Sequence, residues 1–135
     1  MTMKSTTCPF CTIDESKNVL ENDRAVAFYD NFPVTPGHAL IVPRRHIASF
    51  FEATKEEQAA LFELVSEMRE RVLAERAPDG FNIGINDGTA AGQTVMHLHI
   101  HLIPRYAGDT EDPRGGVRWI MPVKAPYWKK GERKT

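Results

Sequence analysis

The sequence has few cysteines, no long hydrophobic run and no excess of charge of either sign. Its 135 residues include two cysteines, too few for a disulfide framework, so we expect a soluble, cytoplasmic protein. No apolar run approaches the roughly 20 residues that span a bilayer, and residues 1–9 lack the apolar core of a signal peptide. With 17 Lys and Arg against 18 Asp and Glu, the net charge is −1, which argues against a DNA- or RNA-binding protein held by positive charge.

What is present fits one globular domain of strands and one long helix. Hydrophobic residues make up 41% of the chain and charged residues 26%, as in folded rather than disordered proteins. The apolar segments 25–29 and 38–43 predict two strands, and the loop between them is too short for a helical crossover, so they should pair antiparallel. Residues 81–86 alternate apolar with small or polar side chains and predict a third strand.

A helix is predicted from about residue 55 to residue 76. Thr54 and Glu57 have the spacing of a capping box, in which the two side chains accept hydrogen bonds from backbone N–H groups of the first turn. Pro78 and Gly80 mark the end of the helix. Apolar residues recur on one face at helical spacing and predict that this face packs against the sheet. They are Leu61, Leu64, Val65, Met68 and Val72.

Three histidines alternate with apolar residues in the segment 97–103, which predicts a fourth strand. Alternate side chains of a strand share a face, so His97, His99 and His101 should point one way while the apolar residues between them pack against the helix. At about 3.3 Å per residue, neighbouring histidines are about 7 Å apart. Because imidazole titrates near neutral pH, such a row can hold a nucleophile, a proton carrier and a metal ligand side by side.

A three-histidine zinc site is the main competing interpretation of this row. Zinc hydrolases use three imidazoles and keep one position open for water. Against this interpretation, no Asp or Glu lies beside the row to act as a base. The preceding loop instead carries neutral hydrogen-bond donors suited to phosphate oxygens, and a glycine that allows close approach of the backbone. These loop residues are Asn86, Asp87, Gly88, Gly92, Gln93 and Thr94.

The two cysteines form a C-x-x-C pair, Cys8 and Cys11. Alone, this spacing is ambiguous between a redox pair and half of a zinc site. The order of predicted elements around it is not the βαβ order of a thioredoxin-like protein, which makes the redox interpretation the weaker one.

The segment 92–103 closely resembles the signature of the histidine triad (HIT) family of nucleotide hydrolases and transferases. The likeness extends over residues 28–30, 36–38, 42–46 and 86–88. The resemblance implies an α+β fold in which a five-stranded antiparallel sheet packs against one long helix, and in which two chains dimerise to a ten-stranded sheet. It also implies a domain over residues 1–111 and a C-terminal extension over residues 112–135.

The resemblance implies that the middle histidine, His99, attacks the α-phosphorus of a nucleotide. A covalent nucleotidyl-histidine would form and water would cleave it, which divides one difficult displacement into two easier ones. The substrate would be a nucleoside phosphate, a phosphoramidate or a diadenosine polyphosphate. By the same resemblance, His101 and Thr94 contact the phosphate and help to protonate the leaving group, and His38 supports the triad.

The substrate-binding residues are likewise implied by the family pattern. Asp30 would accept hydrogen bonds from ribose hydroxyls, and the loop would orient the phosphate oxygens. Asn31 stands where family members often carry an apolar contact to the base. The base pocket would be formed by Phe10, Ile13 and Phe28, and the phosphate loop by Asn86, Gly92, Gln93 and Thr94.

Bacterial-type members of the family with this C-x-x-C opening resemble a subgroup that holds a structural Zn²⁺ ion. The resemblance implies that Cys8, Cys11, His46 and His97 are its four ligands. Two thiolates and two imidazoles match tetrahedral zinc, and a full shell leaves no water to activate. We expect no organic cofactor and no partner other than the nucleotide and a second copy of the chain.

The C-terminal extension is expected to be more than a solvated tail. Residues 124–135 carry five Lys and Arg and one Glu, which is typical of a mobile basic tail. Both tryptophans, Trp119 and Trp128, also lie in the extension, however, and disordered tails rarely contain them. Residues 112–120 would form a final strand and loop, or pack at the dimer interface or beside the leaving group, with Arg114 or Arg118 contacting distal phosphates.

Two function classes remain as alternatives to the covalent mechanism. One is a metal-dependent hydrolase in which His97, His99 and His101 bind zinc. The other is a regulatory module that binds nucleotides with little turnover. A trapped intermediate, the effect of chelation and the presence of product would distinguish them.

Overall fold

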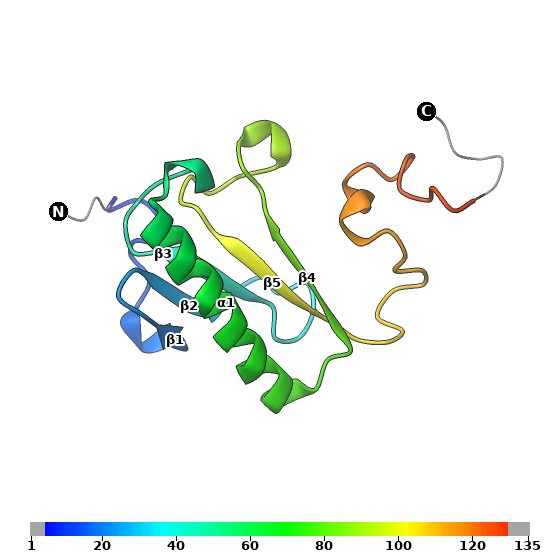
Figure 1. The fold of residues 1–135 in the computed structure, drawn as a ribbon, viewed down its shortest axis with the longest axis horizontal. Helices are drawn as coiled ribbons and strands as arrows, with labels where there is room; N and C mark the ends of the chain where they lie inside the picture. The colour runs from blue at the N-terminus through cyan, green and yellow to red at the C-terminus, as the bar shows by residue number, and fades with distance from the viewer. Residues whose placement is uncertain (1–4, 130–135) are drawn as a thin grey trace.

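The computed structural model describes residues 5–129 and contains one five-stranded antiparallel sheet in the order β1-β2-β3-β5-β4. A single long helix, α1 (Lys55–Arg76), lies across one face of the sheet (Figure 1). The predicted α+β fold is therefore confirmed. The strands are β1 (Leu20–Glu21), β2 (Ala25–Tyr29), β3 (Ala39–Pro43), β4 (Gly80–Ile85) and β5 (Ile100–Arg105). Short 3₁₀ turns are η1 (Glu15–Lys17), η2 (Phe50–Glu52), η3 (Thr89–Ala91) and η4 (Gly116–Ile120).

Helix α1 begins and ends where its sequence signals predict. The Thr54 side chain accepts from the Glu57 N–H, and the Glu57 carboxylate accepts from the Thr54 N–H, so both halves of the capping box are present. The chain leaves the helix at Ala77, which has a left-handed φ of 49°, and Pro78 follows. Among residues 5–129, no helix combines the length and the hydropathy needed to cross a bilayer.

The main core lies between α1 and the sheet. The apolar stripe of the helix meets the small and branched residues of β2 and β3, and Leu98, Ile100 and Leu102 complete the layer. The predicted alternation of the histidine segment is therefore confirmed, because its apolar residues face the helix and are almost fully buried.

A second, smaller cluster covers the opposite face of the sheet. It is built by Val26, Phe28, Leu40 and Val42, against which Phe10 and Ile13 of the N-terminal segment pack. Since His101 is directly opposite Leu40 in the β3–β5 ladder, it shares this face. The triad therefore lies on the side away from the helix.

The bounds of the histidine strand differ from the prediction, and one short strand was not predicted. Strand β5 runs from Ile100 to Arg105 rather than over residues 97–103, because its ladder with β3 ends at the pair of Ile41 with Ile100. The chain before it stays attached through the Leu98 N–H, which donates to the Ile47 carbonyl. Strand β1 has only two residues and carries no alternating pattern that could predict it.

Residues 112–120 contain the turn η4 (Gly116–Ile120) and no strand. Gly115 and Gly116 both have positive φ values, 93° and 46°, which turn the chain sharply. Figure 1 shows this C-terminal segment, orange to red, standing apart from the helix and sheet on the side of β4. The last six residues of the expected basic tail lie outside the described part of the chain.

Candidate active site and metal cluster

His99 is held with one defined nitrogen available for chemistry. Its side chain is buried, and Nδ1 lies 2.8 Å from the backbone carbonyl oxygen of His97. A carbonyl can only accept, so Nδ1 carries the hydrogen and Nε2 of the neutral ring keeps its lone pair. The arrangement therefore presents Nε2 of His99 as a nucleophile without the need for a separate base.

His38 and His101 form a hydrogen-bonded pair that is oriented from the backbone. The Val34 N–H donates to Nδ1 of His38 at 3.1 Å, so the neutral His38 ring carries its hydrogen on Nε2. That N–H donates to Nδ1 of His101 at 3.0 Å, which places the hydrogen of His101 on its own Nε2. The imidazole of His101 lies 5.0 Å from that of His99, centroid to centroid. His101 therefore offers an N–H donor next to the nucleophile.

Burial keeps this pair neutral. Burial, followed by the neighbouring His99 and His38 rings, lowers the pKa of His101 to about 4, and the nearby Asp30 opposes the shift. Burial also lowers the pKa of His38, again against the attraction of Asp30, whose Oδ2 lies 3.5 Å from Nε2 of His38. At neutral pH both rings act as hydrogen-bonding groups rather than as cations.

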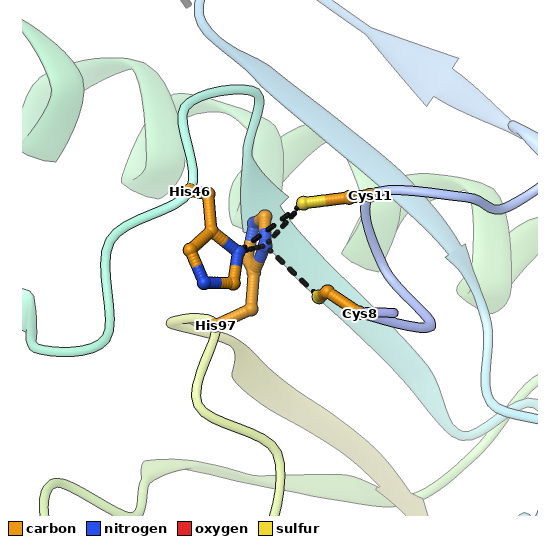
Figure 2. A group of neighbouring side chains, drawn as sticks. All are labelled: Cys8, Cys11, His46 and His97. Atoms are coloured by element: carbon orange, nitrogen blue, oxygen red, sulfur yellow. Dashed lines mark hydrogen bonds between the residues drawn. The ribbon is translucent and has the colours of Figure 1, made fainter. Parts of the chain in front are cut away.

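Cys8, Cys11, His46 and His97 converge in a second cluster beside the triad (Figure 2). Sγ of Cys8 and Sγ of Cys11 each lie 3.5 Å from Nδ1 of His97. Nδ1 of His46 lies 3.2 Å from Sγ of Cys11 and 3.2 Å from Nδ1 of His97. The cysteines come from the N-terminal segment, His46 from the turn after β3, and His97 from the triad segment. The four predicted ligands are thus brought together.

These separations fit a tetrahedral zinc ion. Ligand bonds of about 2.0–2.1 Å to nitrogen and 2.3 Å to sulfur at tetrahedral angles give about 3.4 Å between nitrogens and about 3.6 Å between nitrogen and sulfur. Nε2 of His97 lies 2.8 Å from the Pro43 carbonyl, so that nitrogen carries the hydrogen and Nδ1 keeps the lone pair that a metal needs. Burial raises the pKa of the Cys8 thiol, so a nearby cation would be needed to stabilise its thiolate.

The structure does not bring the three triad imidazoles to one point. His97 belongs to the cysteine cluster, whereas His101 groups with Asp30 and His38. Among residues 5–129, no group of candidate metal ligands contains His97 together with His99 and His101. His38 is also a poor ligand, because Val34 donates to one of its nitrogens and the other carries the hydrogen. This geometry disfavours the three-histidine zinc hydrolase.

The turn that carries His46 is tied to helix α1 by an ion pair that the sequence analysis missed. Nε and Nη2 of Arg45 donate to the two carboxylate oxygens of Glu57 at 3.0 and 2.7 Å. Glu57 is nearly buried and also caps the helix, so one carboxylate joins the start of α1 to the residue before a metal ligand. The capping-box position of Glu57 was visible in the sequence, but its partner was not.

Phe10 lies between the two clusters and the apolar face of the sheet. Its ring packs edge-on against His99 at 5.1 Å and against His97 at 5.9 Å, centroid to centroid, and lies 5.7 Å from Phe28. A small cavity beside it is also lined by Ile13 and Val42. Of the three residues predicted to form the base pocket, Phe10 contacts the nucleophile, and Ile13 and Phe28 belong to the apolar cluster around Phe10.

The loop residues predicted to contact phosphate have two different surroundings. Asn86, Gly92 and Thr94 are exposed, and Gly92 has a positive φ of 95°. The Gln93 side chain is instead buried: its oxygen accepts from the Gly88 N–H, and its nitrogen donates to two backbone carbonyls. Gln93 thus shapes the loop, and its contact with a phosphate remains a prediction.

The two arginines expected near distal phosphates already have partners. Arg114 pairs with Asp112 and stacks over Trp128, with 4.6 Å from Cζ to the ring centroid. Arg118 donates to backbone carbonyls of the C-terminal segment and stacks over Tyr127 at 4.8 Å. Both side chains hold this segment together, and their contact with phosphates remains a prediction.

Comparisons with known proteins agree with this geometry. A family model described as "HIT domain" matches residues 13–108. An uncharacterised HIT-like protein of Saccharolobus solfataricus is 40% identical over 108 residues, covering 77% of this chain and 78% of that protein. The crystal structure of a HIT family protein from Bacillus anthracis has a TM-score of 0.72 and 38% identity, covering 78% of both chains. A zinc-bound histidine triad protein from Mycobacterium smegmatis has a TM-score of 0.71 and 32% identity, covering 78% of this chain and 80% of that chain.

Two further relatives are named for an activity. An adenylylsulfatase of Arabidopsis thaliana is 33% identical over 106 residues, which are 76% of this chain and 54% of that protein. An asymmetrical bis(5'-nucleosyl)-tetraphosphatase of Schizosaccharomyces pombe is 38% identical over 85 residues, which are 63% of this chain and 47% of that protein.

Proposed function

This chain belongs to the HIT family, and from that premise we propose that it is a nucleotide hydrolase acting through a covalent nucleotidyl-His99 intermediate. The hydrogen bond from Nδ1 of His99 to the His97 carbonyl is the observation that carries the proposal, because it leaves Nε2 as the nucleophile. The substrates are nucleoside phosphates, phosphoramidates or dinucleoside polyphosphates that are cleaved at the α-phosphorus.

In the first step, the lone pair of Nε2 of His99 forms a bond to the α-phosphorus. The bond from phosphorus to the leaving group breaks, and its electron pair departs with the leaving group. The ring of His99 becomes positively charged, and the His97 carbonyl that accepts from Nδ1 stabilises that charge. Nε2–H of His101 donates a hydrogen bond to the phosphate or to the leaving atom, and an amine leaving group would take the proton that it needs from solvent.

In the second step, a water oxygen forms a bond to phosphorus and the bond from phosphorus to Nε2 breaks. The electron pair returns to Nε2 of His99, and the nucleoside monophosphate is released. The water gives up one proton to the solvent, which balances the proton that an amine leaving group takes from solvent in the first step. The free enzyme is regenerated, and the net reaction consumes one water.

The remaining residues would bind the substrate. Asp30 would accept from the ribose hydroxyls, and Phe10, Ile13 and Phe28 would enclose the base. Exposed donors of the loop would meet the phosphate oxygens, namely Asn86, Gly92 and Thr94. The name of the adenylylsulfatase relative supports an adenylyl group on the retained side, and the name of the tetraphosphatase relative supports a nucleosyl phosphate there.

Zinc would be held by Cys8, Cys11, His46 and His97 in a structural role. When bound, the ion supplies a tetrahedral crosslink, and its four protein ligands leave no position at which water could be activated. Cys8 and Cys11 fix the segment that carries Phe10, and His97 fixes the carbonyl that orients His99.

We also propose that two copies of the chain form a homodimer through strand β4. Within residues 5–129, β4 pairs only with β5, so one edge is open. Residues 80–85 carry no charge and no proline, the usual means by which an edge strand avoids pairing. Antiparallel pairing of β4 with its copy would give the ten-stranded sheet. Sedimentation velocity would show a dimer, and a monomer at micromolar concentration would contradict this part.

The covalent step is tested by trapping. Brief incubation with an adenylate substrate, a quench at alkaline pH and peptide mass spectrometry should find AMP on His99. His99→Ala should abolish turnover, whereas Glu63→Gln, on the exposed side of α1, should leave it unchanged. AMP on another residue, or activity in His99→Ala, would contradict the mechanism. Micromolar nucleotide binding without product would instead indicate a regulatory module.

A further inference from the structure

The hydrogen that His38 shares with His101 has a second acceptor close to it. The Val34 N–H donates to Nδ1 of His38, so Nε2 carries the one nitrogen-bound hydrogen of this neutral ring. Nε2 lies 3.0 Å from Nδ1 of His101 and 3.5 Å from Oδ2 of Asp30. The three side chains form one cluster. The hydrogen bond to His101 therefore has a competitor in the Asp30 carboxylate.

Asp30 is fixed beside His38 by the backbone. Its N–H donates to the His38 carbonyl at 2.9 Å, so the two residues lie opposite each other just beyond the paired ends of β2 and β3. Oδ1 of Asp30 accepts from the Phe32 N–H at 2.9 Å. Within the described part of the chain, no N–H or O–H donates a well-aligned hydrogen bond to Oδ2, and the side chain is 15% exposed. Oδ2 is thus an anionic acceptor that a ligand can reach.

The charge of Asp30 acts on both imidazoles of the pair. Burial is the main cause that lowers the pKa of His38 and of His101, and the Asp30 carboxylate opposes this shift in both rings. An ionised acceptor forms a hydrogen bond roughly twice as strong as a neutral one. A small rotation of the Asp30 side chain toward His38 would therefore be enough to draw the Nε2–H of His38 away from His101.

The effect of this competition falls on His101. While Nδ1 of His101 accepts from His38, its own hydrogen is on Nε2, and this N–H is the donor next to His99. Once the bond from His38 is lost, the His101 ring can exchange that hydrogen through solvent and carry one on Nδ1 instead. Nε2 then presents a lone pair, which repels the oxygens of a phosphate. The direction of one hydrogen thus separates a productive form from an unproductive one.

A hydroxyl of the substrate can decide between these two forms. Phe28 and Asp30 are two residues apart in an extended segment, so Asp30 lies on the face of the sheet where Phe10 packs against Phe28. In the proposed function, the base lies against these rings and the sugar hydroxyls donate to Asp30. A hydroxyl that donates to Oδ2 satisfies the carboxylate and leaves the hydrogen of His38 to His101.

We propose that Asp30 couples recognition of the sugar to catalysis: its carboxylate competes with His101 for the Nε2–H of His38, and a ribose hydroxyl of the substrate ends this competition. Asp30 is in this respect a positioning residue, which acts on the phosphate through His38 and His101. The inference rests on the proposed nucleotidyl-His99 chemistry. It adds to that chemistry a reason for the ribose hydroxyls to raise kcat as well as to lower KM.

The kinetic test combines a change in the substrate with a change in Asp30. AMP-amide and its 2′,3′-dideoxy analogue share the base, the phosphorus and the leaving group. In the wild type, the analogue should have a higher KM and a kcat about tenfold lower, which is part of the hundredfold or more that removal of an oriented donor costs. In Asp30→Asn the carboxylate charge is gone. The KM for AMP-amide should rise, but the kcat values for the two substrates should become nearly equal.

Asp23→Asn is the matched control, because it removes the same charge at an exposed position just before β2. This variant should keep the wild-type difference in kcat between the two substrates. If the wild type cleaved both substrates with the same kcat and differed only in KM, Asp30 would be a ribose ligand without any coupling. A difference in kcat that persisted unchanged in Asp30→Asn would also overturn the inference.

Nitrogen NMR of the histidine rings measures the tautomer without turnover. In His99→Ala, bound AMP should shift His101 toward the form with its hydrogen on Nε2, whereas 2′,3′-dideoxy-AMP should leave the tautomer as it is in the free protein. When Asp30→Asn is added to His99→Ala, this form should predominate even without a ligand. The same tautomer of His101 in all of these samples would contradict the coupling.

The outcomes separate this inference from the proposed function. Cleavage of AMP-amide through a nucleotide on His99, without any effect of the ribose hydroxyls on kcat, would overturn the coupling alone. Cleavage of neither substrate by the wild type would overturn the proposed function and the inference with it.

Discussion

The backbone carbonyl of His97 accepts a hydrogen bond from Nδ1 of His99 at 2.8 Å, while the side chain of His97 belongs to the cysteine cluster. One residue therefore takes part in both sites. Its Nδ1 faces two sulfur atoms and its Nε2–H donates to Pro43, so its ring is fixed at both nitrogens. Any change that releases this ring also releases the carbonyl that determines which nitrogen of His99 is the nucleophile.

Removal of the metal is the first prediction from this connection. Cys8→Ser should lose zinc, and the free energy of unfolding should fall by more than about 3 kcal/mol, because a metal that binds only the folded state stabilises it by its binding free energy. The KM for AMP-amide should rise, since Phe10 is carried by the released segment. Metal analysis measures the zinc content, calorimetry measures the stability, and steady-state kinetics measure the KM.

Chelation of the wild type distinguishes a structural from a catalytic ion. Activity should decline slowly and in parallel with unfolding. Thr7→Ala, an exposed change next to Cys8, is the matched control and should keep both metal and stability. Immediate loss of activity, reversed at once by added zinc without any change in the fold, would show instead that the ion is catalytic.

His38 is predicted to act through His101 rather than on the substrate. Its Nε2–H, oriented by the Val34 N–H, is the donor that places the hydrogen of His101 on the nitrogen facing away from the pair. His38→Ala should lower kcat by roughly tenfold to a hundredfold, a range in keeping with the loss of one oriented donor. His38→Gln keeps an N–H near the position of Nε2 and should recover part of the loss. Equal activities of the two variants would rule out this orienting role.

Local sequence patterns were enough to predict the helix, four strands and the row of histidines. The capping box of Thr54 and Glu57 and the alternation around His99 are local features, and each specifies which way a side chain points. The ligand set of the cysteine cluster came from the family resemblance, since a C-x-x-C pair alone does not reveal that His46 and His97 lie beside it.

The contacts that could not be predicted depend on how the chain folds back on itself. The bond from the Val34 N–H to His38 spans only four residues, but it depends on the shape of the loop between β2 and β3. The pair of Arg45 with Glu57 depends on how helix α1 packs against the turn after β3, which no short pattern encodes. The burial of Gln93 was missed for the same reason, because its partners include the Ala48 carbonyl, 45 residues away. A final strand was one option for residues 112–120 because Val117, Trp119 and Ile120 are apolar, but Gly115 and Gly116 turn the chain there.

Stability should depend on pH through His101. Burial lowers the pKa of His101 to about 4 in the folded protein, against an ordinary value of 6.5. Between these pH values the unfolded chain binds a proton that the folded protein does not, so this contribution is fully present above about pH 6.5 and is lost as the pH falls toward 4. The loss amounts to about 3 kcal/mol at most, and the lowered pKa of His38 acts in the same direction.

Urea unfolding at pH 7 and at pH 4.5 measures this effect when the wild type is compared with His101→Gln. Release of metal in acid affects both proteins, so the difference between them isolates the imidazole. The wild type should lose more stability than the variant. Parallel losses in the two proteins would mean that His101 does not titrate as its burial requires.

The pair of Arg45 with Glu57 should support both helix α1 and the metal cluster. The Glu57 carboxylate accepts two hydrogen bonds from Arg45 and one from the Thr54 N–H, and its side chain is only 7% exposed. Glu57→Gln preserves the shape and the cap but removes the charge, which should cost about 1–2 kcal/mol because the guanidinium loses a charged partner. Because Arg45 precedes His46, the same variant should also bind zinc more weakly, as competition with a chelator would show. Glu56→Gln, an exposed change one residue earlier, is the matched control. If the two variants were equally stable and bound zinc equally well, the ion pair would have no part in positioning His46.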